Sequence, residues 1–132
     1  MLFPAVARAG DARQSVIDRV NQVRVSNGLN PLRPSPSLSR TSSSFSNDMM
    51  NRGAFGHRPK VSASSRFKTL GEALGMHFGH KPKAAATVRR WLGSPGHRSV
   101  ILKRGVSWVG AGYSFGRFRG RRATIWVLQV GK

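Results

Sequence analysis

The chain of 132 residues contains no cysteine, which excludes disulfide bonds, thiolate zinc sites and cysteine nucleophiles together. No apolar run approaches the roughly 18 residues of a membrane-spanning helix, since the densest ones, such as residues 125–128, are only strand-sized. Acids are also scarce: four Asp and Glu stand against 23 Lys and Arg, for a formal net charge of +19. This balance makes polyanions the expected class of partner, but it names no function.

The residues that are present suffice for one folded domain. Hydrophobic residues make up 39% of the sequence and include three Trp and seven Phe, so we expect a packed core despite 15 Gly and 7 Pro. The length fits a single domain, which we assign to residues 11–132. Residues 1–10 are predicted to be a disordered tail or a signal-peptide remnant, since alanine triplets at 5–7 and 7–9 resemble cleavage sites without a complete apolar segment before them.

Apolar residues at helical spacing, with capping residues at the ends, predict four helices. The first begins at a capping box formed by Asp11 and Gln14, and the second begins at the Ser35-Pro36 cap. In the second, the small residues 42–44 favour close packing against another element. The predicted helices cover residues 11–26, 36–52, 82–92 and 95–102, and the third carries Trp91 on its buried side.

Segments rich in β-branched and aromatic residues predict three strands, at residues 70–78, 106–113 and 123–130. Residues 114–122 are expected to join the last two as a basic hairpin loop. In the first strand, alternation places Glu72, Leu74 and Met76 on one side. An unpaired carboxylate is costly to bury, so Glu72, the only acid in the second half of the chain, needs a partner.

Four histidines are available for chemistry. His57 follows the second helix, and His97 falls in the first turn of the short fourth helix, after Ser94. A histidine in either place can serve as a metal ligand or a base, although each alone is also typical of an ordinary hydrogen-bonded residue. His77 and His80 lie at a strand end, and we interpret them as surface residues. No paired-carboxylate hydrolase can be assembled from the three Asp and one Glu.

A series of motifs occurs along most of the chain, from about residue 15 to 130. They are Val20-Asn21 with Arg24, Gly-Leu-Asn-Pro-Leu at 28–32, Phe55-Gly56-His57, Gly71-Glu72, Trp-Leu-Gly-Ser-Pro-Gly-His-Arg-Ser-Val-Ile-Leu at 91–102, and Val109 to Tyr113 with Ile125-Trp126. In this order they resemble the CAP superfamily, the cysteine-rich secretory, antigen 5 and pathogenesis-related proteins, in its bacterial, cysteine-free form. The run at 91–102 is the longest and most specific of them.

The resemblance implies an α+β fold, a three-layer α-β-α sandwich with a small antiparallel sheet. It implies that His57, Glu72 and His97 line a cleft and together hold Zn²⁺ or another divalent cation, with Ser94 and Arg98 supporting the cleft. It also implies a secreted protein, extracellular or in the cell envelope, that binds a small or polymeric ligand. We expect a monomer.

Three departures from the family pattern weaken the expected chemistry. Ala73 replaces the usual Asn after Glu72, Gly56 replaces the usual Ser before His57, and Ser94 stands where other members offer a second acid. With one carboxylate left, hydrolysis by an acid pair is not expected, and metal binding is expected to be weak or absent.

Two alternative functions stay open at this stage. A polyanion- or nucleic-acid-binding module would use Arg117, Arg119, Arg121 and Arg122 with the interleaved Phe115 and Phe118, although the same segment also fits a solvated hairpin tip. From the overall charge we expect weak, non-specific polyanion binding. A metal-assisted hydrolase would use the three cleft residues on the ion with a bound water as nucleophile. The residues leave it open whether any reaction is catalysed.

Overall fold

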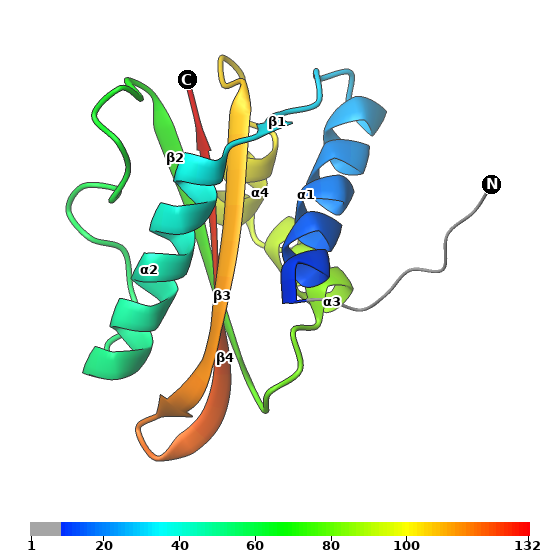
Figure 1. Cartoon of the computed structure of the whole chain (residues 1–132). Coiled ribbons are helices and arrows are strands. Elements are labelled where there is room, and N and C mark those ends of the chain that lie inside the picture. Colours follow the sequence, from blue (N-terminus) through cyan, green and yellow to red (C-terminus); the bar gives the residue numbers. More distant parts are fainter. Residues whose placement is uncertain (1–8) are drawn as a thin grey trace.

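The computed structural model describes residues 9–132, so the predicted tail or signal-peptide remnant lies almost entirely outside the described residues (Figure 1). The elements in chain order are α1 (Ala9–Ser26), β1 (Arg33–Pro34), α2 (Pro36–Arg52), β2 (Leu70–Phe78), α3 (Ala84–Leu92), α4 (Pro95–Ile101), β3 (Trp108–Phe118) and β4 (Arg121–Gly131). Within the described part of the chain, no helix is both long and apolar enough to cross a membrane.

The strands form one sheet in the order β1-β3-β4-β2. The three long strands pair antiparallel, and the two residues of β1 pair parallel with the start of β3. Helix α2 covers one face of this sheet, and α1, α3 and α4 cover the other (Figure 1). The predicted three-layer α-β-α sandwich is therefore confirmed, with a sheet that is mixed because of β1.

Helix α2 is defined by strong local signals. The Ser35 hydroxyl accepts a hydrogen bond from the backbone N–H of Leu38 at 3.1 Å, and Gly53 ends the helix in the left-handed conformation. The helix lies very close to β3, because a Cβ added to Gly110 would stand 2.2 Å from the backbone of Leu38. A Cβ at Gly112 would stand 2.3 Å from the backbone of residue 43, so the predicted close packing is confirmed.

The opposite face of the sheet contains the larger core, to which α1, α3 and α4 contribute. Trp91 is 2% exposed there, and its Nε1–H donates to the carbonyl of Leu74 at 2.8 Å. The prediction that Trp91 is a core residue is confirmed. Because this hydrogen bond ends on β2, it fixes α3 against the outer edge of the sheet.

A buried arginine fixes the position of α4. Arg24 donates to the carbonyl oxygens of Asn30, Ile101 and Lys103 at 2.8, 3.0 and 2.7 Å, and it is buried without a carboxylate partner among the described residues. Burial lowers the pKa of Arg24. Its three carbonyl contacts join the end of α1, the following turn and the end of the helix that carries His97.

Three details of the sequence prediction are wrong. Helix α1 begins at Ala9, so Asp11 lies inside the helix and not at its N-cap. Helix α3 begins at Ala84, because Lys83 in the left-handed conformation separates it from Pro82. The expected loop at 114–122 is instead a continuous hairpin, in which a two-residue turn at 119–120 with φ of 50° and 86° lets both strands continue to the tip.

Candidate functional site

Glu72 lies on β2 directly opposite Gln129 of β4. The Gln129 Nε2–H donates to Glu72 Oε2 at 2.9 Å, and the Glu72 side chain is only 2% exposed. The other end of the amide is also engaged, because Gln129 Oε1 accepts a hydrogen bond from Thr41 of α2 at 2.6 Å. The buried carboxylate is therefore held by a neutral side chain that is itself fixed between two elements.

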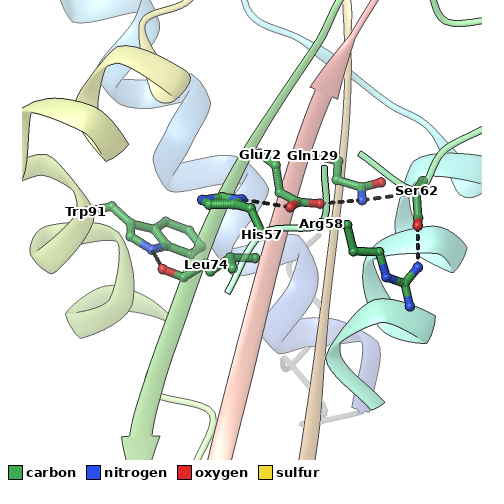
Figure 2. A network of polar contacts seen from close by, with 7 residues as sticks. All are labelled: His57, Arg58, Ser62, Glu72, Leu74, Trp91 and Gln129. Atoms are coloured by element: carbon green, nitrogen blue, oxygen red, sulfur yellow. Dashed lines mark hydrogen bonds and ion pairs between the residues drawn. The ribbon is translucent and has the colours of Figure 1, made fainter. Parts of the chain in front are cut away.

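His57 is the second partner of the carboxylate (Figure 2). Its Nδ1 lies 2.9 Å from Glu72 Oε1, while its side chain is 53% exposed. Since an ionised carboxylate can only accept, Nδ1 carries the hydrogen and donates it. His57 is thus a partner for the buried Glu72, and only Nε2 of His57 is left to meet a ligand.

The loop that carries His57 is anchored by the neighbouring Arg58. Its Nη2–H donates to Asp48 of α2 at 2.6 Å, Nη1–H donates to Ser62, and the guanidinium lies 4.6 Å from the Phe45 ring centroid. The hydrogen bond from Arg58 is the main cause that lowers the pKa of Asp48. The Ser62 carbonyl in turn accepts a hydrogen bond from Gln129 at 3.2 Å, which connects this anchor to the carboxylate (Figure 2).

Sequence reasoning missed both Gln129 and the anchor formed by Arg58. A single amide inside the apolar run 125–130 was a usable signal, because a buried amide needs partners. Arg58 carried no comparable signal, since nothing in the sequence indicates that its side chain contacts Asp48 of α2.

His97 lines a separate small pocket beside the outer edge of β2. Its volume is about 160 Å³, and its lining residues are Leu74, Gly75, Met76, Thr87, Arg90, Trp91, Ser94 and His97. Leu74, which lines this pocket, follows Glu72 by two residues on β2. Of the two residues expected to support the cleft, Ser94 lines this pocket, whereas Arg98 is exposed and does not.

The arrangement of the described side chains does not support the expected three-ligand metal site. Among them, no group of three or more His, Cys, Asp and Glu is placed to hold a metal ion. Both oxygens of Glu72 already accept hydrogen bonds, which gives the carboxylate the role of orienting His57. The donors left for a cation are two imidazoles, fewer than the three protein ligands of a catalytic zinc site.

The four candidate polyanion-binding arginines lie on the hairpin end. Arg119 donates to the Gly53 carbonyl at 3.1 Å and lies over the Phe118 ring, and the Arg121 guanidinium lies 3.6 Å from the Phe78 ring centroid. Arg117 and Arg122 face each other across the two strands. All four are exposed, and they lie on β3, on β4 and in the two-residue turn between them instead of in a long loop.

These features define a small α-β-α sandwich domain with a histidine–glutamate pair on the edge strand β2. A family model described as "CAP: Cysteine-rich secretory protein family" matches residues 17–130, and the chain belongs to this family. The resemblance drawn from the motifs is thereby confirmed. "Uncharacterized protein YkwD" of Bacillus subtilis (strain 168) is 29% identical over 129 residues, which cover 90% of this chain and 47% of that protein. The chain thus spans about half the length of that relative.

Solved structures share the fold. An outer surface protein from Borrelia burgdorferi has a TM-score of 0.76 at 15% identity, with 96% of each chain covered. An extracellular protein containing a SCP domain from Bacillus anthracis has a TM-score of 0.73 at 20% identity, covering 93% of this chain and 41% of that one. A structure of NaASP2 with Zn²⁺ has a TM-score of 0.69 at 15% identity, covering 98% of this chain and 82% of that one.

Proposed function

We propose that this protein acts outside the cell or in the cell envelope as a ligand-binding CAP domain whose cleft is centred on His57. The observation that carries the proposal is a half-exposed imidazole held through Nδ1 by a buried carboxylate. Because Gln129 and the Asp48–Arg58 anchor fix that carboxylate and the loop, Nε2 is oriented before a ligand arrives. Preorganisation of this kind lowers the entropic cost of binding.

The adjoining pocket supports a ligand of mixed character. Leu74, Met76 and Trp91 supply apolar surface, and Ser94 and His97 supply hydrogen-bonding groups. A volume of about 160 Å³ is below the roughly 300–1,000 Å³ of pockets that enclose whole small ligands. The pocket therefore suits a small molecule or the end group of a polymer, with the remainder lying over His57.

A divalent cation is the weaker candidate ligand. His57 would bind it through Nε2, with Glu72 holding the ring, and His97 is the second available donor. Two donors suit a weak site, so a metal-assisted hydrolase gains no support from this geometry. The location outside the cell rests on relatives described as extracellular or as an outer surface protein.

Calorimetric titration of the full chain with Zn²⁺ alone tests whether the proposed cleft binds a ligand through His57. We expect weak binding that His57→Gln abolishes and that His97→Gln reduces. Glu72→Gln should weaken it roughly tenfold or more, as loss of an orienting carboxylate does at other metal-bound histidines. His77→Gln is the matched control, because His77 lies at the far end of β2 and should leave binding unchanged. Zinc binding that survives His57→Gln would contradict the proposed cleft.

A further inference from the structure

The end of the β3–β4 hairpin places two like charges directly opposite each other. Arg117 and Arg122 are register partners, so their side chains occupy the same face, and both residues are exposed. Like charges in this position destabilise a sheet. None of the ion pairs found among the described residues involves either arginine; Arg117 donates only to the Gly120 carbonyl, at 3.2 Å. An anion held between the two guanidinium groups would relieve the repulsion.

The same face carries an exposed aromatic ring next to this pair. Phe115 precedes Arg117 by two residues and therefore shares its face, and it is 45% exposed. The ring is stacked on His80 at a centroid distance of 5.3 Å and an interplanar angle of 15°. His80 is held in turn by a hydrogen bond between its Nε2 and the Gly116 carbonyl at 2.9 Å. The exposed Phe115 ring is thus supported on one side by His80.

The surroundings reinforce the positive potential. Residues 73–132 contain no acid, and the hairpin extends past the ends of the helices on both sides of the sheet (Figure 1). Arg117 and Arg122 belong to this end of the hairpin, and Phe115 lies two residues before Arg117 on β3.

We propose that this face binds single-stranded nucleic acid, with Arg117 and Arg122 on a phosphate and Phe115 stacked against a neighbouring base. The guanidinium fork suits phosphate oxygens, and stacking on an aromatic ring accepts any base. Residues two apart on a strand lie about 6.5 Å apart, so adjacent parts of one strand can contact both features. The bases of a duplex are already stacked on one another, so a duplex would make no use of the Phe115 ring. A membrane surface would require apolar residues at the tip of the hairpin, but residues 117–122 are mainly basic.

The test is fluorescence anisotropy with a labelled single-stranded oligonucleotide of mixed sequence, titrated with the full chain at several salt concentrations. Phe115→Leu should weaken binding about fivefold or more. Phe78→Leu is its matched control, since Phe78 is 48% exposed at the same end of the sheet but on the opposite face. Phe115→Trp keeps a stacking ring and should retain the wild-type affinity, which separates loss of stacking from loss of folding.

The arginine pair is tested by the double variant Arg117→Gln with Arg122→Gln. Its affinity should fall about tenfold at low salt, and the log-log salt slope should flatten by about 0.7 for each phosphate that the variant no longer neutralises. The double variant Arg19→Gln with Arg89→Gln removes the same charge from exposed positions on α1 and α3 and should change affinity less than threefold. The proposal is overturned by equal losses in the two double variants, by equal losses in Phe115→Leu and Phe78→Leu, or by tighter binding to duplex DNA or anionic vesicles than to the single strand.

Discussion

Removal of the Glu72 carboxylate is the sharpest test of the polar network in the cleft. Glu72→Ala leaves the buried Gln129 amide without one acceptor, at a cost of about 1–3 kcal/mol, and adds a small cavity between β2 and the loop. It also removes the cost of burying a charge, which offsets part of the loss. We expect a net fall in the free energy of unfolding of about 2–4 kcal/mol.

The substitution Glu72→Gln separates shape from charge. The new amide can accept from Gln129 and still contact His57, so its cost should be about 1 kcal/mol. Asp18→Ala is the control, because Asp18 is an exposed carboxylate on α1 and its loss should stay within about 0.5 kcal/mol. Urea unfolding followed by tryptophan fluorescence measures all three variants. A Glu72→Ala cost equal to that of Asp18→Ala would refute the reasoning.

Three further outcomes are expected. Trp91→Ala should lower the free energy of unfolding by about 3–5 kcal/mol in urea, since its ring is buried in the core; a cost below about 1 kcal/mol would contradict that packing. Gly110→Ala should lower the free energy of unfolding by about 1–3 kcal/mol or more, because the added Cβ meets the backbone of α2. Gly96→Ala, where the added Cβ meets open space, should leave the free energy of unfolding unchanged in the same assay. The ion pair between Asp48 and Arg58 should be intact above the ordinary pKa of an aspartate and should be lost as the pH falls through the lowered pKa of Asp48. In Asp48→Asn at neutral pH, amide exchange of residues 54–62 should be as fast as in the wild-type chain after this loss. Unchanged exchange of these residues in the variant would exclude the anchor.

Local signals explain which elements were predictable. The bounds of α2 follow from Ser35 and Gly53, because a cap acts within one turn of the chain. The bounds of β2 were also predicted correctly, since alternation and its flanking residues are local features. The hairpin end was missed because Arg119-Gly120 is not a common pair for such a turn, and only pairing with β4 keeps residues 114–118 extended.

For the candidate site, the sequence by itself determined that Glu72 needs a partner, and the family motifs pointed to His57 and His97 as cleft residues. Only the tertiary structure decided that the carboxylate is shared between His57 and Gln129, and that His97 lies in a pocket of its own. The physical reason is that these contacts depend on the register of β2 with β4 and on a loop that returns to α2. Both are set by packing between residues that are distant in the chain, and neither leaves a periodic trace in the sequence.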